Sequence, residues 1–535
     1  MHRRSRHRVV FARDRGQRRD RQQMAPSPPT GVGDHHRFTT YRPRPSLRCP
    51  PRPLRVPQPG TKFPTVVAVG SVRGRRWRCV RCAEQSMAAI DLGTLIGRPR
   101  EHVFLQHRDG VIVHGPTGAG KTWRVAYQRV CDAPGFALVT TTKADLVAAT
   151  IAQRAQRGRV AVFDPEGLTG WPAGLRWSFL AGCADPDTAI RRADAAARAM
   201  PLEGTRNGAY FEQKAATMLR CCLHAAAIGN YSIRDVRVWV SARTNRTPVD
   251  ILSRTLPDWA SELDQILGSS SESTDDVLAA ASRLLEPLAS PKLLAAIDVD
   301  PSESFDIERF VLSGTSTLYL VSKGSTRSMA PFVAALAAEV HHVADRASQL
   351  RPGKRLDPPA RLVLDETNNV APIPDLPQIM TDSGGKGICV WAFAHNQDQN
   401  ELRWGTEGGR VLAQSAPAML ILPGLRGTDE LASISRLIGE RRGWEASLHQ
   451  GGRTYQLHDD TVLRADEIRE LPSDHALLLY RNAPACLLRL PSVWETPSWR
   501  REALASTALF DEIVTSGTVP DHLRPPDHDD SGGCR

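Results

Sequence analysis

The most informative segment of the chain reads Val111-Ile-Val-His-Gly-Pro-Thr-Gly-Ala-Gly-Lys-Thr122. Its apolar start predicts a short buried strand, and a helical pattern follows Lys121. The phosphate-binding pattern G-x-x-x-x-G-K-[ST] is fitted by Gly115, Pro116, Thr117, Gly118, Ala119, Gly120, Lys121 and Thr122. Such a loop directs backbone N–H groups at a phosphate, and the positive end of the following helix dipole adds to the attraction. The segment therefore predicts an ATP site in which Lys121 reaches the β- and γ-phosphates and Thr122 ligates Mg²⁺.

A second motif, Arg361-Leu-Val-Leu-Asp365-Glu366, is an apolar strand that ends in two acids. Beside the phosphate loop, Asp365 can hold the Mg²⁺ shell, and Glu366 can orient and deprotonate the attacking water. Two acids after a strand are common in turns. In combination with the phosphate loop they are specific, because simple kinases lack the second acid. We therefore expect a P-loop ATPase in which Lys121 and Glu366 are catalytic.

A third polar group, His395-Asn396-Gln397, follows the apolar strand predicted for Ile388 to Ala394. Doubly wound sheets bind their ligands at the carboxyl ends of the strands. His395 would then lie near the γ-phosphate and could sense it, relaying hydrolysis to neighbouring elements. The alternative is a capped strand end without a role in catalysis, and the sequence leaves both interpretations open.

The composition, with 41% apolar residues in 535, is that of a globular chain of two or three domains. From Glu101 onward short apolar strands alternate with helices, which is typical of a parallel sheet covered on both faces. Between Asp185 and Asp300 nearly every segment is helical, the longest expected helix running from Asp275 to Ile297. We expect an α/β fold, namely a P-loop, RecA-like, doubly wound and mostly parallel sheet with an inserted all-α domain. The expected ranges are 1–86 for a disordered Arg/Pro-rich tail, 87–184 and 301–497 for the ATPase domain, 185–300 for the helical insertion and 498–535 for a C-terminal tail.

Basic residues are concentrated near the N-terminus. Of the 69 Lys and Arg residues, 21 lie in residues 1–86, which hold only 4 Asp and Glu. The net charge of +11 of the whole chain therefore arises from this stretch. DNA binding by the folded part cannot be inferred from the net charge. We interpret residues 1–86 as a disordered leader or a start codon assigned too far upstream, with a basic arm for DNA or anionic lipid as the alternative.

Several features predict a cytoplasmic protein. The chain lacks the run of about 18 apolar residues that a membrane helix needs, and Met1 to Val10 lacks the apolar core of a secretory signal. The 10 cysteines are scattered, which suits reduced thiols. Cys79-Val-Arg-Cys82 is the one metal-like pair, and no second pair follows at zinc-finger spacing, so we do not expect zinc there.

Together the motifs resemble those of the type IV coupling proteins of bacterial conjugation (TraG/TraD-like), within the FtsK/HerA class of P-loop DNA motors. The resemblance covers most of Val111 to Trp494. Besides the phosphate loop and the helical insertion, it is carried by Val162-Phe-Asp-Pro165, Leu362-Val-Leu-Asp-Glu366 with Asn368-Asn369, Ile373-Pro-Asp-Leu-Pro377, Gly384-Gly-Lys-Gly-Ile388 and Val462-Leu-Arg-Ala-Asp-Glu-Ile-Arg-Glu-Leu-Pro472. The stretch from Asp365 to Pro377 is the most diagnostic, because generic ATPases do not follow the acid pair with this helix entry.

The resemblance implies a ring-shaped homo-hexamer that hydrolyses ATP between subunits. It would deliver a relaxase-bound single strand of DNA to a type IV secretion channel, and the helical domain would help to recognise this substrate. Coupling proteins usually begin with membrane helices, so docking at the inner face of the cell membrane would need a partner. His395 stands where the family commonly has Gln, and Lys386 where it often has Arg. Arg403, Arg410 and Arg426 are candidates for an arginine supplied to a neighbouring subunit.

Two other functions stay open. A DNA partition or packaging motor of the same class would share the ATP site and differ in its partners. A non-hydrolysing adaptor of a mobile element would bind ATP as a structural cofactor and recruit substrates through its helical domain. ATP turnover separates the adaptor from both motors, and co-transfer of a relaxase separates coupling from partition.

Overall fold

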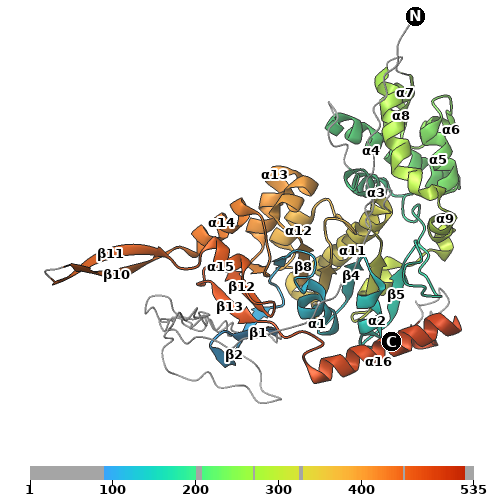
Figure 1. The fold of residues 1–535 in the computed structure, drawn as a ribbon. Coiled ribbons are helices and arrows are strands. Elements are labelled where there is room, and N and C mark those ends of the chain that lie inside the picture. The colour runs from blue at the N-terminus through green and yellow to red at the C-terminus, as the bar shows by residue number, and fades with distance from the viewer. Residues whose placement is uncertain (1–88, 201–207, 269–271, 324–328, 450–451, 524–535) are drawn as a thin grey trace, which may run out of the picture. The chain divides into compact units, whose positions relative to one another are not determined.

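The computed structural model describes residues 89–200, 208–268, 272–323, 329–449 and 452–523. Its main sheet is 11-stranded, in the order β2-β1-β13-β12-β9-β3-β8-β7-β4-β6-β5 (Figure 1). From β9 to β5 in this order, each pair of adjacent strands is parallel. The pairs from β2 to β9 are antiparallel. The expected α/β fold with a mostly parallel sheet is confirmed.

The strands of this sheet are β1 (Ala89–Leu95), β2 (Arg98–Gln106), β3 (Val111–His114), β4 (Ala137–Thr141), β5 (Val160–Phe163), β6 (Thr317–Val321), β7 (Ala360–Leu364), β8 (Ile388–Ala394), β9 (Ala418–Ile421), β12 (His475–Tyr480) and β13 (Cys486–Arg489). A separate two-stranded sheet, which we did not expect, pairs β10 (Glu440–His449) with β11 (Gly452–Thr461). The helices are α1 (Tyr127–Cys131), α2 (Ala144–Ala155), α3 (Pro186–Arg198), α4 (Gly208–Gly229), α5 (Ile233–Ser241), α6 (Thr247–Leu252), α7 (Pro257–Gly268), α8 (Glu272–Leu285), α9 (Pro291–Ile297), α10 (Ile307–Leu312), α11 (Ala330–Leu350), α12 (Leu376–Asp382), α13 (Gln397–Ser415), α14 (Thr428–Ile438), α15 (Ala465–Arg469) and α16 (Pro497–Ser516).

The central strands are buried on both faces. Successive side chains of a strand point to opposite faces, so Leu138 and Leu362 join one hydrophobic cluster, while Val139 and Val363 join the other. This explains why these strands read as continuous apolar runs instead of alternating polar and apolar residues. Each hydrophobic cluster packs against one face of the sheet. The polar residues of the predicted motifs therefore lie at the carboxyl ends of the strands.

Strand order places the three predicted motifs together. β8 pairs with β3 on one side and with β7 on the other, in both cases parallel. The carboxyl ends of all three strands therefore meet at one edge of the sheet. These ends lead into the phosphate loop, into His395 and into the acid pair, with the histidine strand between the other two.

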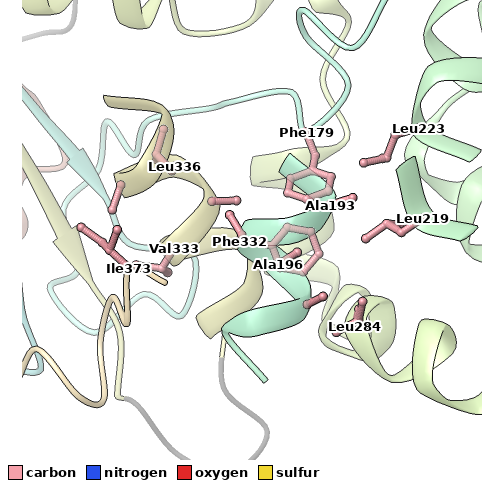
Figure 2. Close-up of a cluster of buried hydrophobic side chains, with 14 of the residues drawn as sticks. Phe179, Ala193, Ala196, Leu219, Leu223, Leu284, Phe332, Val333, Leu336 and Ile373 are labelled. Atoms are coloured by element: carbon pink, nitrogen blue, oxygen red, sulfur yellow. The ribbon is translucent and has the colours of Figure 1, made fainter. Parts of the chain in front are cut away.

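The helices α3 to α9 lie between β5 and β6 in the chain, as the predicted helical insertion requires. Figure 2 shows how this block shares a core with α11, because Ala193 of α3 and Leu219 of α4 lie in one cluster with Phe332 of α11. The rings of Phe179 and Phe332 lie 4.9 Å apart and pack edge to face. The insertion is thus joined to the sheet layer by continuous apolar packing.

The expected helix from Asp275 to Ile297 is divided. α8 ends at Leu285, a 3₁₀ turn (Glu286–Ala289) follows, and α9 begins at Pro291. Pro287 and Pro291 cause the break, since proline lacks the backbone N–H that a continuous helix would need and restricts the residue before it. Apolar periodicity alone predicted one helix where two are formed.

The prediction of a C-terminal tail at 498–535 is wrong for the residues that form α16. Its residues Ala503, Ser506, Phe510 and Ile513 are buried at helical spacing. The hydroxyl of Ser506 donates to the carbonyl of Ala148 in α2 at 2.6 Å, and Phe510 stacks on Trp171 at 5.5 Å. Residues 497–516 therefore belong to the α/β unit.

Two other expectations concern the N-terminus and the membrane. The predicted tail 1–86, with the pair Cys79 and Cys82, lies outside the described residues. Within the described ranges, no helix combines the length and the apolar character that crossing a bilayer demands.

His107, a buried histidine directly after β2, predicts that the stability of the fold depends on pH. His107 accepts a hydrogen bond at Nδ1 from Arg361 Nη2 at 2.7 Å, and both side chains are buried. Burial, together with the charge of Arg361, lowers the pKa of His107 to about 4. Because the pKa in the unfolded chain is about 6.5, the unfolded state binds more protons between these values, and stability is lost as pH falls from about 6.5 to about 4.

We expect His107→Asn to reduce this loss, because the Asn carbonyl can accept from Arg361 but does not titrate. The difference between wild type and variant should approach about 3 kcal/mol at low pH. It can be measured as the change in melting temperature between pH 7.5 and pH 5. An equal change in both proteins would show that His107 does not contribute.

Candidate nucleotide-binding site

The phosphate loop follows β3 and needs its glycines. Gly118 and Gly120 have φ values of 85° and 92°, which other residues rarely adopt. At Gly115 a Cβ would lie 2.9 Å from Cβ of Leu422, too close for a larger residue. The chain then enters a helix at Lys121, so the loop has the strand-to-helix position that phosphate binding requires.

Lys121 lies at the centre of the loop with its ammonium group almost enclosed. Nζ donates to the carbonyl of Gly115 at 2.7 Å and lies 3.0 Å from Nδ1 of His395 and 3.8 Å from Oε1 of Glu366. The side chain is 6% exposed. Burial lowers the pKa of Lys121, although the charges of Glu366 and Asp365 oppose this shift. The loop thus holds one buried cation where phosphate is expected.

Asp365 and Thr122 are arranged as oxygen ligands for a cation. The Thr122 hydroxyl donates to Oδ2 of Asp365 at 3.3 Å. The other oxygen, Oδ1, is buried and has no hydrogen-bond partner among the described residues. Burial, and then the charge of Glu366, raises the pKa of Asp365 to about 7. A divalent cation would satisfy the unpartnered oxygen and favour the ionised carboxylate, so this donor set fits Mg²⁺.

Glu366 is held in a strained position. Its φ of 53° lies in the left-handed region, which is unfavourable for a residue with a side chain and is found often at functional sites. Oε2 lies 2.9 Å from Nε2 of His395, and Nδ2 of Asn369 donates to the same oxygen at 3.5 Å. Burial alone would raise the pKa of Glu366, but the hydrogen bond from His395 and the charge of Lys121 lower it overall. The carboxylate is therefore ionised, as a general base must be.

His395 lies between the two charged groups. Its Nδ1 accepts from the Lys121 ammonium, and its Nε2–H donates to Glu366. One ring nitrogen thus acts as an acceptor and the other as a donor. A Gln amide, which is common at this position in the coupling-protein family, also offers one acceptor and one donor. The predicted position of His395 beside the phosphate loop matches the geometry, and its role in sensing stays a prediction.

A cavity of about 340 Å³ opens beside the phosphate loop. It is lined by Pro116, Thr117, His395, Asn396, Gln399, Gly424, Leu425 and Arg426. Arg426 therefore shares a cavity with the phosphate loop of its own chain. A contact of Arg426 with a neighbouring subunit stays a prediction.

The other cationic candidates lie elsewhere. Arg403 donates to the carbonyl of Ala199, and Arg410 on α13 lies 3.3 Å from Glu407. Lys386 forms ion pairs of 2.7 Å and 2.8 Å with acids of α11 and α12. Arg410 is exposed, and which of the arginines contacts another subunit stays a prediction.

Comparison with known proteins adds a family and a fold. Residues 359–473 match the family described as "TraM recognition site of TraD and TraG". This segment contains Asp365, Glu366 and His395. No curated protein matches the chain in sequence.

The solved structures that resemble the chain include the bacterial conjugative coupling protein TrwB. Its unbound form has a TM-score of 0.55 and 20% identity, covering 75% of this chain and 88% of that one. The complex with a non-hydrolysable ATP analogue has a TM-score of 0.56 and 19% identity, covering 76% and 90%. The complex with ADP and Mg²⁺ has a TM-score of 0.55 and 19% identity, covering 72% and 85%.

The chain has the fold of the coupling protein TrwB, and its residues 359–473 match a segment of the TraD and TraG family. The resemblance inferred from the motifs is confirmed. The acid pair and His395 fall inside the segment that matches the family, whereas the phosphate loop precedes it. The phosphate loop is thus supported by its own motif and geometry.

Proposed function

We propose that this chain is a P-loop ATPase that drives conjugative DNA transfer as a coupling protein. It binds ATP with Mg²⁺ at residues 115–122 and hydrolyses the bond between the β- and γ-phosphates, which releases ADP and phosphate. The observation that carries this proposal is the convergence of Lys121, Asp365, Glu366 and His395 at one edge of the sheet. The fold supports it, because TrwB has the same fold and has been described with an ATP analogue and with ADP and Mg²⁺.

Each residue has one task in this mechanism. The loop N–H groups and Lys121 bind the phosphates, and Thr122 and Asp365 would hold Mg²⁺. The metal, when bound, neutralises charge that develops on the phosphates. Glu366 orients the attacking water and takes its proton. His395 holds Glu366 through Nε2–H and keeps it aligned with Lys121.

The free energy of ATP hydrolysis would drive the movement of DNA. We infer a homo-hexameric ring that carries a relaxase-bound single strand to a type IV secretion channel. The inner loops of the ring would contact the phosphate backbone, a mode that is salt-dependent and largely independent of sequence. The protein would act in the cytoplasm, with membrane docking through a partner.

DNA binding by the full chain tests this assignment. We expect fluorescence anisotropy to show tighter binding of a single-stranded oligonucleotide than of the matching duplex. Affinity should fall by about tenfold or more between 50 and 200 mM salt. Preference for duplex would instead favour a partition or packaging motor. Absence of DNA binding in the presence of ATP and Mg²⁺ would contradict both motors and favour the adaptor.

Two variants of His395 test whether this residue positions Glu366 through a hydrogen bond. His395→Gln should retain kcat within about fivefold, because Gln also offers one donor and one acceptor. His395→Ala should lower kcat by about 10²-fold, because Glu366 loses its positioning hydrogen bond. Steady-state phosphate release measures both rates. Equal activity of the Ala variant and wild type would identify His395 as a strand cap only.

A further inference from the structure

A chain of buried polar side chains runs beside the ATP site. Asn368 Nδ2 donates to Asn400 Oδ1 at 3.0 Å, and Asn400 Nδ2 lies 3.2 Å from His114 Nε2. His114 Nδ1 lies 2.6 Å from Oε1 of Glu430. All four side chains are at most 9% exposed. We name this chain of Asn368, Asn400, His114 and Glu430 the buried relay.

The donors of the relay all point the same way. The Glu430 carboxylate accepts, so His114 carries a proton on Nδ1, and its Nε2 faces the amide nitrogen of Asn400 and accepts from it. Asn400 therefore donates through its amide nitrogen and accepts from Asn368 through its oxygen. The direction of one hydrogen bond in the relay cannot be reversed alone. Such a reversal would leave two acceptors or two donors facing each other in a buried place.

The relay connects every strand end of the ATP site. Asn368 follows Glu366 by two residues, and His114 immediately precedes the phosphate loop. Asn400 lies in the first turn of α13, the helix that begins just after His395. Glu430 also accepts, through Oε2, from the backbone N–H of Gln397 at 3.4 Å.

The far end of the relay lies on α14. Glu430 is in the first turn of this helix, whose last residue is Ile438. The strand β10 begins at Glu440, so α14 leads directly into the β10–β11 sheet. A displacement of α14 would therefore be passed along the chain to this hairpin.

We propose that the buried relay is a positioning network that couples nucleotide at the phosphate loop to α14 and the β10–β11 hairpin. It rests on the proposed function, because it requires nucleotide to bind at residues 115–122. A ligand that shifts the ends of β3, β7 or β8 must either carry α14 with it or break a buried hydrogen bond. Fully satisfied buried networks favour the concerted movement.

Hydrogen exchange of the full chain tests the coupling without needing turnover. Addition of Mg²⁺ and the non-hydrolysable analogue AMP-PNP should change exchange of α14 amides by about fivefold or more in the wild type. His114→Asn retains a donor toward Glu430, but its shorter side chain has no acceptor at the position of Nε2, which faces Asn400. Glu430→Gln has one acceptor for the two N–H groups that the carboxylate serves. Both variants should lose the response of α14 while AMP-PNP affinity stays within about threefold.

Matched controls lie on the surface. His102→Asn removes an exposed histidine that pairs with Asp91 at 2.8 Å, and Glu407→Gln removes an exposed acid of α13. Both should keep the wild-type response. The relay variants should also lower kcat for ATP by about tenfold without changing KM, the signature of a positioning role.

The outcomes separate the two proposals. A wild-type protein that responds to AMP-PNP but shows no ATP turnover contradicts the proposed hydrolysis and supports the relay. Relay variants that respond like wild type overturn the relay and leave the ATPase intact. If a variant unfolds, hydrogen exchange of the wild type still tests the coupling. AMP-PNP binding to the wild type without any change in exchange of α14 would overturn it. Absence of nucleotide binding contradicts both.

Discussion

Glu366→Gln should lower kcat for ATP hydrolysis by about 10³-fold, in the range expected for loss of a general base. The substitution keeps the size of the side chain and removes its ability to take a proton from water. ATP binding should change little, because the phosphate loop and Lys121 are untouched. Steady-state phosphate release gives the rate, and equilibrium binding of a labelled ATP analogue gives the affinity.

The control for this substitution is Glu407→Gln, which changes the same side chain at an exposed position of α13. It should have wild-type kcat. A Glu366→Gln protein that retains a tenth or more of the wild-type rate would mean that another group activates the water. His395 would then be the next candidate, since its Nε2 lies 2.9 Å from Oε2 of Glu366.

Lys121→Ala should weaken ATP binding by about 10²-fold and abolish measurable hydrolysis. The ammonium group is buried at the loop and is the one cation within 4 Å of Glu366 among the described residues. Its removal also takes away a charge that lowers the pKa of Glu366. Both nucleotide affinity and the state of the base are therefore affected.

Lys386→Ala provides the matched control for Lys121. Lys386 pairs with Asp345 and Asp382, and neither acid belongs to the site. Nucleotide affinity, measured by isothermal titration, should stay at the wild-type value in this variant. Equal loss of affinity in both Lys variants would indicate general destabilisation, and unchanged affinity in Lys121→Ala would contradict the site.

The phosphate loop and the acid pair could be predicted because their signals are local. A strand, a glycine turn and a helix follow one another within Val111 to Ala126, and Gly118 and Gly120 supply the positive φ values of the turn. His395 could be placed because parallel strands end at a common edge. Its contact with both Lys121 and Glu366 needed the strand order, which the sequence does not state.

The buried relay could not be predicted, because its members are far apart in sequence. His114 and Glu430 are separated by 316 positions. Taken locally, Glu430 resembles an ordinary acid in the first turn of a helix, where the dipole favours it. By contrast, α16 had a sequence signal, since Ala503, Phe510 and Ile513 recur at helical spacing. Polar residues between them led to the incorrect prediction of a tail.

The most direct test of the proposed motor is the rate of Mg²⁺-dependent ATP hydrolysis by the full chain, without DNA and with single-stranded or duplex DNA. We predict ATP turnover with a kcat in the usual range of enzymes. DNA should raise this kcat by about tenfold. Single-stranded DNA should be more effective than duplex DNA. Lys121→Ala and Glu366→Gln should abolish ATP turnover. Tight ATP binding without turnover under every DNA condition would contradict the motor and leave a recruiting adaptor as the better description.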